Sequence, residues 1–250
     1  MPINKDSNQK LLKISELFCS IQGEGISSGT SCIFLRLSNC NLKCSWCDTK
    51  YTWDWDNYDI NKETTEISVD DLTLKIFEFS EIDRLVITGG EPLLQQNNLI
   101  FLLKEINNKS YKKIEKPFFV EIETNGTILP NKELTNMIDQ WNISPKTSNS
   151  NNDQFGINLD KIYKDTLTFY RTLKNAFFKF VVDNEKDLIE IEQNIKKFDL
   201  PKSRIILMPQ ATTKEKILEK SDWLKEYAIR TDILFSSRLQ VLLWDYHRGK

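Results

Sequence analysis

Short apolar runs alternate with segments of helical hydrophobic period from residue 31 to the end of this 250-residue chain, and this alternation constrains the fold most. The runs predict strands at 31–37, 84–88, 117–123, 141–144, 176–182, 204–208 and 239–244. Strands that alternate with helices pair in parallel through crossover connections. Six or seven strands are too few to close an eight-stranded barrel. We therefore expect an α/β fold, built either as an open doubly wound sheet or as a partial barrel.

Capping signals mark the starts of the helices between these strands. One helix opens at Ser68, another has Pro92 in its first turn, and a third is capped by Thr212. Apolar residues recur at helical spacing after each start, so we expect each helix to pack one face against the sheet. The polar stretch 147–158 and the Trp- and Tyr-rich stretch 50–65 are expected to be surface loops.

The charge of the chain is nearly balanced, with 34 Lys and Arg against 36 Asp and Glu and a formal net charge of −2. No global positive charge is available to release counterions from a nucleic-acid backbone, so nucleic acid is not an expected partner. No run of about 18 apolar residues is present, so no membrane partner is expected either. Residues 1–13 have no apolar signal region, which favours a cytoplasmic protein with a flexible N-terminal tail at 1–13.

A single histidine, His247, lies three residues from the end of the chain. Zinc sites rich in histidine and mechanisms with paired histidines are therefore excluded. A Ser-His-Asp relay would depend on this terminal residue, and no Gly-x-Ser-x-Gly motif accompanies it. We interpret His247 as a residue of the solvated tail.

The five cysteines, Cys19, Cys32, Cys40, Cys44 and Cys47, all lie in the first fifth of the chain. Cys19 and Cys32 fall in apolar stretches and are expected to be buried as small hydrophobic residues. The other three form a Cys-x3-Cys-x2-Cys loop, which suits metal or cluster ligation better than a disulfide framework. Three thiolates on a four-iron cluster leave one iron open to a small molecule. The alternative is a zinc site completed by Cys19 or Cys32.

Polar motifs follow four of the predicted strands. They are Thr88-Gly89-Gly90-Glu91-Pro92, Glu121-Ile122-Glu123, Ser144-Pro145-Lys146 and Met208-Pro209-Gln210. In parallel β/α folds the active site gathers at the carboxyl ends of the strands, so these motifs are expected to meet there. Glycines allow a ligand to approach the backbone closely, and alternation places Glu121 and Glu123 on one face of their strand. Together the motifs predict a ligand site, although each alone would also suit an ordinary turn.

The cysteine spacing, with Trp46 before the last cysteine, resembles the radical S-adenosylmethionine (SAM) superfamily. The blocks at 20–25, 34–37 and 40–49 are similar to those of the 7-carboxy-7-deazaguanine synthase family, as are Thr88 to Gln95, Glu123 to Thr127 and Ser144 to Lys146. The resemblance extends from about Ser20 to the C-terminus. It implies a partial (incomplete) TIM-like β/α barrel of the radical SAM type. No repeats and no interdomain linker are found in the sequence, so we expect residues 1–250 to form a single domain.

The resemblance also implies a set of site residues. A 4Fe–4S cluster would be held by Cys40, Cys44 and Cys47. SAM would be contacted by Trp46, Cys47, Asp48, Gly90, Glu123, Ser144, Pro145, Lys146, Met208, Pro209 and Gln210. The substrate would be contacted by Ile21, Gln22, Gly23, Arg36 and Thr88, and magnesium would be bound by Thr49. The planar guanidinium of Arg36 matches a substrate carboxylate, and the alternative is a surface arginine on an edge strand. The hydroxyl of Thr49 suits a hard cation shared with substrate oxygens, and the alternative is a threonine that caps the loop.

The activity implied by the resemblance is that of a carbon–nitrogen lyase. It converts 6-carboxy-5,6,7,8-tetrahydropterin to 7-carboxy-7-deazaguanine with loss of ammonia, on the pathway to the modified tRNA nucleoside queuosine. The bound cofactors supply a 5′-deoxyadenosyl radical, and the protein excludes water and orients the substrate. The implied partners are the pterin substrate, an electron donor such as flavodoxin or ferredoxin, and a second copy of the chain in a homodimer. The sequence assigns no acid–base pair.

Two alternative functions make different predictions. A glycyl-radical-enzyme activase would keep the cluster and SAM but act on a protein, and would require neither Arg36 nor magnesium. A non-catalytic zinc- or cluster-binding interaction module would leave the polar motifs at the strand ends without a role.

Overall fold

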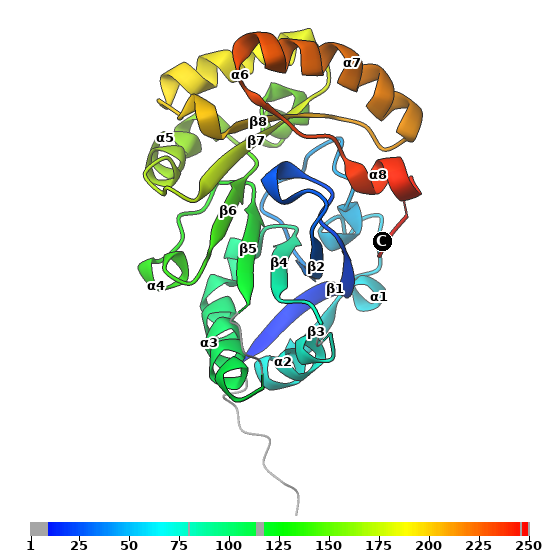
Figure 1. The fold of residues 1–250 in the computed structure, drawn as a ribbon, viewed down its shortest axis with the longest axis vertical. Helices are drawn as coiled ribbons and strands as arrows, with labels where there is room; N and C mark the ends of the chain where they lie inside the picture. The colour runs from blue at the N-terminus through cyan, green and yellow to red at the C-terminus, as the bar shows by residue number, and fades with distance from the viewer. Residues whose placement is uncertain (1–9, 80, 114–117, 246, 250) are drawn as a thin grey trace, which may run out of the picture.

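A nine-stranded sheet lies at the centre of the computed structural model, which describes residues 10–79, 81–113, 118–245 and 247–249 (Figure 1). The strands are β1 (Leu11–Ile21), β2 (Ser31–Leu37), β3 (Thr65–Ser68), β4 (Arg84–Gly89), β5 (Phe119–Thr124), β6 (Gln140–Ile143), β7 (Ala176–Val182), β8 (Ile205–Pro209) and β9 (Leu234–Phe235). Their order in the sheet is β3-β1-β2-β4-β5-β6-β7-β8-β9. Because β3 and β9 form the two edges and do not pair with each other, the sheet is an open, incomplete barrel, as the sequence predicted.

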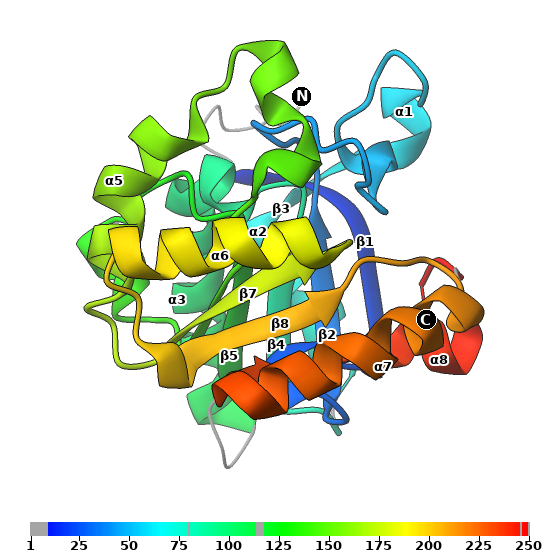
Figure 2. The same ribbon diagram turned by 90° about the horizontal axis from the view of Figure 1, so that it is seen from above.

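Eight α-helices are described. They are α1 (Ile60–Glu63), α2 (Val69–Phe77), α3 (Gln96–Lys113), α4 (Lys132–Thr135), α5 (Leu159–Tyr170), α6 (Glu185–Lys197), α7 (Lys214–Thr231) and α8 (Leu239–Trp244). Of these, α2 to α7 pack against one face of the sheet, whereas α1 and α8 contribute no residue to the main core. Short 3-10 helices occur at Gly25–Ser27, Lys50–Thr52, Pro92–Gln95, Ser148–Ser150, Asn152–Phe155 and Lys202–Arg204. Figure 1 shows α6 and α7 on the same side of β7 and β8, and Figure 2, seen from that side, shows α6 beside β7 and α7 beside β8. Within the described residues, no helix combines the length and apolar character needed to cross a membrane.

Alternation along each strand separates an apolar face from a polar one. In β2, Ile33 and Leu35 belong to the main core cluster, whereas Arg36 faces the inside of the open barrel and lines its cavity. In β7, Phe178 and Phe180 are fully buried in the same core, whereas Lys179 lines the cavity. Successive side chains of a strand point to opposite faces. Alternate residues of one strand therefore pack against the helices, and the residues between them line the interior of the barrel.

The main core lies between the sheet and the helices. Leu85 and Ile87 of β4 and Ile122 of β5 are fully buried there, together with Leu99 of α3 and Leu167 of α5. Each such side chain contributes about 1.5–3 kcal/mol by leaving water. The apolar helix stripes that the sequence predicted therefore form the outer wall of the barrel.

Parallel pairing extends from β2 to β9, and the N-terminal strands depart from it. β1 pairs antiparallel with both β2 and β3, with a register shift between Ile14 and Glu16. The sequence prediction placed residues 1–13 in a flexible tail, which is wrong for Leu11 to Lys13 because these residues pair with Glu66 to Ser68. Residues 1–9 lie outside the described chain. Neither β1 nor β3 was predicted, because their apolar alternation is interrupted by polar residues.

The segment 239–244 was predicted to be a strand and is the helix α8. A six-residue apolar run does not distinguish a strand from a buried helix by its period. The edge of β8 is already occupied by β9, and the backbone N–H of Leu239 donates to the carbonyl of Gly23 at 2.9 Å. This anchoring turns the chain away from the sheet before the apolar run begins.

Smaller differences concern where elements begin. The cap of α7 is Thr213 rather than Thr212: the backbone of Thr213 is extended, and its hydroxyl accepts from the N–H of Lys216 at 3.5 Å. Pro92 begins a 3-10 helix that leads directly into α3. The predicted strands at 84–88, 141–144 and 204–208 correspond to β4, β6 and β8 with ends shifted by one residue. The strand predicted at 117–123 is observed as Phe119–Thr124, and Pro117 lies outside the described residues.

Candidate active site

One cavity opens at the carboxyl ends of the parallel strands. Among the residues singled out from the sequence, those that line it are Ile21, Gln22, Gly23, Arg36, Cys40, Cys44, Trp46, Cys47, Asp48, Thr49, Thr88, Gly90, Glu123, Ser144, Lys146 and Met208. Pro145, Pro209 and Gln210 are not part of the lining. The carbonyl of Gln210 instead accepts from the Lys220 ammonium of α7 at 2.6 Å. Parallel β/α topology thus brings together motifs that lie more than 160 residues apart in the chain.

The three cysteines of the loop receive polar hydrogens from the surrounding protein. Asn152 Nδ2 donates to Cys44 Sγ at 3.2 Å, and the indole Nε1 of Trp53 donates to Cys47 Sγ at 3.4 Å. The backbone N–H of Leu42 lies 3.4 Å from Cys40 Sγ. Donors directed at sulfur stabilise thiolates that carry negative charge, which is the environment an iron–sulfur cluster requires.

Burial makes the thiols of Cys40 and Cys47 poor acids. It raises the pKa of Cys40 to about 12 and raises that of Cys47. Metal coordination deprotonates a thiol outright, so these cysteines would bind iron as thiolates when a cluster is present. Within the described residues, no three His, Cys, Asp or Glu side chains converge on the position of one metal ion. A four-iron cluster differs from such a site because each thiolate binds a separate iron. The three thiols of Cys40, Cys44 and Cys47 therefore fit a four-iron cluster.

The stretch 147–158 was expected to be a surface loop, and the structure corrects this. Ser150 and Asn152 are buried, and the segment packs against the cysteine loop. Asn152 Oδ1 accepts from the N–H of Lys43 at 2.8 Å, and Asn149 Oδ1 accepts from the indole of Trp46 at 3.1 Å. The segment therefore holds the shape of the cysteine loop. The polar side chains of this segment form hydrogen bonds with backbone and sulfur atoms of the cysteine loop. Its composition therefore resembles that of a solvated loop although part of it is buried.

The double glycine after β4 allows the cysteine loop to approach the sheet. A Cβ atom at Gly90 would lie 2.0 Å from the carbonyl oxygen of Asn39, so no larger residue fits there. Gly89 has a φ of 136°, which favours glycine. Glu91 is fully buried, and its carboxylate accepts from the N–H of Leu93 and from Asn125. Glu91 therefore fixes the turn and does not contact the cavity.

Buried polar residues form the floor of the cavity. Gln22 Nε2 donates to Glu121 Oε1 at 2.9 Å and to Glu123 Oε1 at 3.1 Å, and Thr88 donates to Glu123 Oε2 at 2.7 Å. Arg84 pairs with the other oxygen of Glu121 at 3.0 Å. Burial, and next the charge of Glu123, raise the pKa of Glu121. The floor thus links the residues expected to contact SAM with those expected to contact the substrate.

Arg36 is an interior residue and not a surface arginine. Its Nε donates to Glu16 Oε2 at 2.7 Å, and the hydroxyl of Tyr51 donates to the same oxygen at 2.8 Å. Burial would raise the pKa of Glu16, but the neighbouring Arg36 and Arg248 hold it below its ordinary value. The guanidinium of Arg36 is therefore held at the cavity wall by one of its nitrogens.

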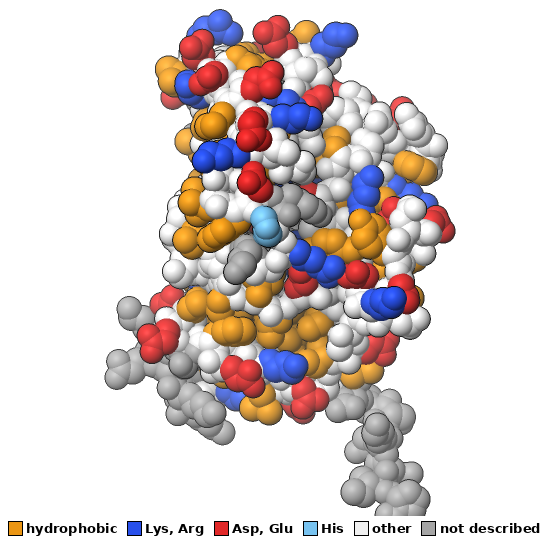
Figure 3. All heavy atoms as spheres, turned by 90° about the vertical axis from the view of Figure 1, so that its right-hand side faces the viewer, with side chains coloured by type: hydrophobic (Ala, Val, Ile, Leu, Met, Phe, Trp, Pro, Cys, Tyr) orange, Lys and Arg blue, Asp and Glu red, His pale blue; other side chains and the backbone are white. Residues whose placement is uncertain are grey.

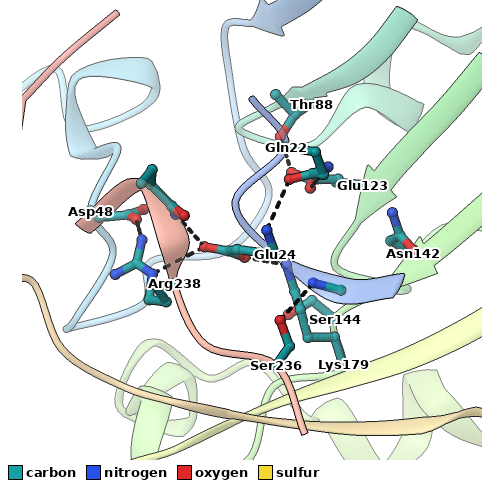
Figure 4. A network of polar contacts seen from close by, with 12 residues as sticks. Gln22, Glu24, Asp48, Thr88, Glu123, Asn142, Ser144, Lys179, Ser236 and Arg238 are labelled. Carbon is teal, nitrogen blue, oxygen red and sulfur yellow. Dashed lines mark hydrogen bonds and ion pairs between the residues drawn. The ribbon is translucent and has the colours of Figure 1, made fainter. Parts of the chain in front are cut away.

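A second group of charges centres on Glu24, with Lys179, Arg238 and Asp48 near it (Figure 4). Glu24 forms ion pairs with Lys179 and with Arg238, whose Nε lies 3.0 Å from Glu24 Oε1. Burial would raise the pKa of Glu24, but Lys179 and Arg238 hold it well below its ordinary value. Arg238 also pairs with Asp48, the residue after Cys47. Two carboxylates and two cations therefore neutralise one another in this group.

The sequence analysis missed several residues of the cavity. They are Phe18, Glu24, Phe34, Leu42, Trp53, Thr124, Asn125, Lys179, Val181 and Gln240, to which no individual role was given; Gly89 also lines the cavity and belonged to the predicted Thr88–Pro92 motif. A lysine within the apolar run of β7 was a readable signal for Lys179, because an isolated charge in a buried strand requires a partner. Gln240 had no such signal, since it reaches the cavity only because α8 folds back over the N-terminal loop.

The comparisons with known proteins define the class first. The family model of the radical SAM superfamily matches residues 36–235. QueE from Escherichia coli has a similar fold, with a TM-score of 0.63, 23% identity and coverage of 92% of this chain and 94% of that chain. Streptococcus suis SuiB bound to S-adenosylmethionine is similar with a TM-score of 0.53, 14% identity and coverage of 79% of this chain and 48% of that chain. The chain is a radical SAM enzyme, whose cofactors are a 4Fe–4S cluster and SAM.

The particular family follows from relatives that match over nearly their whole length. The 7-carboxy-7-deazaguanine synthase of Pyrobaculum aerophilum is 32% identical, over 96% of this chain and 97% of that protein. The synthase of Rhodopirellula baltica is 31% identical, over 99% of this chain and 92% of that protein. The chain belongs to the 7-carboxy-7-deazaguanine synthase family and is a radical SAM lyase. The family favours the lyase over the activase and over the zinc-binding module.

Proposed function

We propose that this enzyme converts 6-carboxy-5,6,7,8-tetrahydropterin to 7-carboxy-7-deazaguanine with loss of ammonia, on the route to queuosine. The observation that carries this proposal is the cavity that joins the three-cysteine loop to Arg36 and to the polar floor. When bound, the cluster and SAM supply a 5′-deoxyadenosyl radical. The protein itself binds and orients the substrate and excludes water.

The SAM side of the cavity is proposed to be its cysteine-loop half. Trp46, Asp48, Gly90 and Glu123 line this half, and Cys40, Cys44 and Cys47 would hold the cluster. Ser144 and Lys146 supply a hydroxyl and an ammonium 2.7 Å apart, which suit a carboxylate or a ribose. Met208 would complete the contacts. Pro145, Pro209 and Gln210 would act only through the backbone shape of their strand ends.

The substrate side is proposed to be the half that contains Ile21, Gln22, Gly23, Arg36 and Thr88. Arg36 uses Nε for Glu16, which leaves its two terminal nitrogens for a substrate carboxylate. Thr49 lies beside Cys47, with its hydroxyl 3.6 Å from the sulfur. One hydroxyl would complete an octahedral Mg²⁺ site only if substrate oxygens and water supplied the other ligands. Magnesium and the substrate would then bind together.

The enzyme requires an electron donor, and we propose a small redox protein such as flavodoxin or ferredoxin in the cytoplasm. We further propose that residues 1–250 form one domain, because one core cluster spans the sheet and its helices. A homodimer is proposed from the family resemblance. Figure 3 shows hydrophobic side chains gathered in the lower part of one face, which offers apolar area to a second copy. Sedimentation analysis would distinguish a dimer from a monomer.

Product analysis tests the proposed activity. Iron-reconstituted protein would be incubated anaerobically with SAM, a reductant, Mg²⁺ and 6-carboxytetrahydropterin, and the products identified by mass. We expect 5′-deoxyadenosine together with 7-carboxy-7-deazaguanine, and a lower yield of the deazaguanine without Mg²⁺. Cys44→Ala should lack both the iron–sulfur absorbance and the products.

Two outcomes would contradict parts of this proposal. Deoxyadenosine without any deazaguanine would keep the radical chemistry and reject the substrate. SAM cleavage by Cys44→Ala would reject the assignment of the cluster ligands.

A further inference from the structure

The C-terminal segment closes the open side of the barrel. After β9 the chain returns to the loop that follows β1: Ser236 Oγ accepts from the N–H of Gly25 at 2.8 Å. The N–H of Leu239 donates to the carbonyl of Gly23 at 2.9 Å. A Cβ atom at Gly23 would lie 2.9 Å from the backbone nitrogen of Gln240, so glycine allows the two backbones to approach this closely. Residues 236–240 are therefore fixed against the loop after β1, and Gln240 among them lines the cavity, although it lies at the opposite end of the sequence.

Arg238 is the residue of this segment that contacts most of the surrounding elements. It is only 8% exposed, and its guanidinium has partners from three separate segments. Nε donates to Glu24 Oε1 at 3.0 Å, Nη2 pairs with Asp48, and Nη1 donates to the carbonyl of Ala211 at 2.6 Å. Figure 4 shows Arg238 between Asp48 and Glu24. Only the planar fork of an arginine can satisfy three acceptors in these directions.

The two carboxylates joined by Arg238 belong to different halves of the cavity. Asp48 directly follows Cys47 on the cysteine loop, and Glu24 directly follows Gly23 on the loop proposed to hold the substrate. Glu24 in turn accepts from Gln240 Nε2 at 2.7 Å and pairs with Lys179 of β7. A single guanidinium thus fixes the distance between the cysteine loop and the substrate loop.

We propose that Arg238 is a positioning residue that holds the SAM half and the substrate half of the cavity in register. The proposal rests on the proposed assignment of those two halves. Arg238 does not itself line the cavity, so its influence passes through Asp48, Glu24 and Gln240. Among the described residues, Gln240 Oε1 is one of a few buried side-chain atoms without a hydrogen-bond partner, which is expected for a group directed at a ligand.

Losing Arg238 should uncouple SAM cleavage from formation of the deazaguanine. The cysteine loop keeps its own contacts with Asn152 and Trp53, so cluster assembly and SAM cleavage should continue. The substrate loop would lose its fixed distance from the cysteine loop. A small misplacement at the reacting atoms lowers the rate of a positioned reaction by up to about 100-fold. The ratio of 5′-deoxyadenosine to deazaguanine should then rise by a comparable factor.

The test compares Arg238→Gln, Arg238→Lys and the control Arg171→Gln with the wild-type enzyme. Arg171 forms an exposed ion pair with Asp199 at the end of α5, so the control removes a guanidinium far from the cavity. Three quantities are measured: iron content, the product ratio, and hydrogen exchange of residues 22–25 and 236–244 in the unreduced protein. We expect full iron, a raised ratio and faster exchange of both segments in Arg238→Gln, an intermediate ratio in Arg238→Lys, and wild-type values in the control.

A product ratio like that of the wild type in Arg238→Gln with full iron content would overturn the proposal. If Arg238→Gln does not fold, Arg238→Lys decides: an unchanged ratio with unchanged exchange overturns the proposal, and a raised ratio supports it. If the wild-type enzyme makes no deazaguanine, the proposed substrate is wrong. Exchange that stays slow in both segments of the variants would then reject the positioning role separately.

Discussion

At the scale of single residues, the site depends on charged side chains that line the cavity and also form an ion pair with another residue of the protein. Arg36 shows this arrangement: Glu16 holds its Nε while its terminal nitrogens remain for a carboxylate. Glu24 shows the opposite arrangement, because two cations and an amide surround it. The first residue is suited to bind a ligand and the second to fix the protein.

Arg36→Ala tests the binding role. A hydrogen bond to a charged group contributes about 1.5–3 kcal/mol, so kcat/KM for the carboxypterin should fall roughly 10- to 100-fold. Iron–sulfur absorbance and SAM cleavage without substrate should stay as in the wild type. Arg171→Ala is the matched control. An unchanged kcat/KM would remove Arg36 from the substrate site.

Glu24→Gln tests the structural role through pH. Breaking a buried ion pair costs about 3–5 kcal/mol, measured by urea unfolding at neutral pH. The pKa of Glu24 is lower in the folded protein than its ordinary value of 4.5. A group of this kind contributes stability above its unfolded pKa and loses that contribution as the pH falls towards the folded value. The stability difference between wild type and Glu24→Gln should therefore shrink below pH 4.5.

The control for this measurement is Glu133→Gln, which removes one partner of an exposed ion pair with Lys104. Exposed pairs contribute about 0–1 kcal/mol, so this variant should unfold close to the wild type at every pH. A difference between wild type and Glu24→Gln that stays constant down to pH 3 would contradict the assigned ionisation of Glu24.

At the scale of elements, the cysteine loop is shaped by two segments that both follow it in the sequence. The 3-10 helices at Ser148–Ser150 and Asn152–Phe155 hold Lys43, Cys44 and Trp46, and Trp53 holds Cys47. Short polar segments can do this because the loop presents backbone N–H groups and sulfur atoms, which require hydrogen-bond partners when buried.

Asn152→Ala tests the support of the loop. The variant loses the donor to Cys44 Sγ at 3.2 Å, and with it a hydrogen bond of about 0.5–1.5 kcal/mol. Reduction adds negative charge to the cluster, so the reduced form loses more stabilisation than the oxidised form. The midpoint potential should fall by roughly 20–60 mV for a one-electron couple, measured by an EPR-monitored titration. Asn98→Ala, whose side chain bonds only to the carbonyl of Leu11, should leave it unchanged. A rise in potential would contradict the prediction.

At the scale of the whole molecule, one sheet serves two purposes because its faces differ in polarity. The outer face packs the helices in one continuous core, and the inner face carries the polar floor and the cavity. The antiparallel β1 and the C-terminal segment flank the open side of the barrel. Stability and ligand binding are thus assigned to opposite faces of the same strands.

Phe180→Ala tests the continuity of the core. Phe180 is fully buried in β7, so its truncation should cost roughly 3–5 kcal/mol in urea unfolding. Fluorescence and circular dichroism should follow a single shared transition in both proteins if the chain is one cooperative domain. Ile229→Ala is the control: this side chain is 79% exposed, so the change should stay within about 0.5 kcal/mol. Two separate transitions would contradict the single domain.

The sequence by itself determined the β/α order, the six inner strands from β2 to β8, the cysteine loop and the family. These features are local, since apolar period and motif spacing are properties of short segments. The tertiary structure alone decided that 239–244 is a helix, that 147–158 supports the cysteine loop, and that Arg238 meets Glu24 and Asp48. Those contacts join residues up to 214 positions apart, and only the curvature of the open barrel brings them within hydrogen-bond distance.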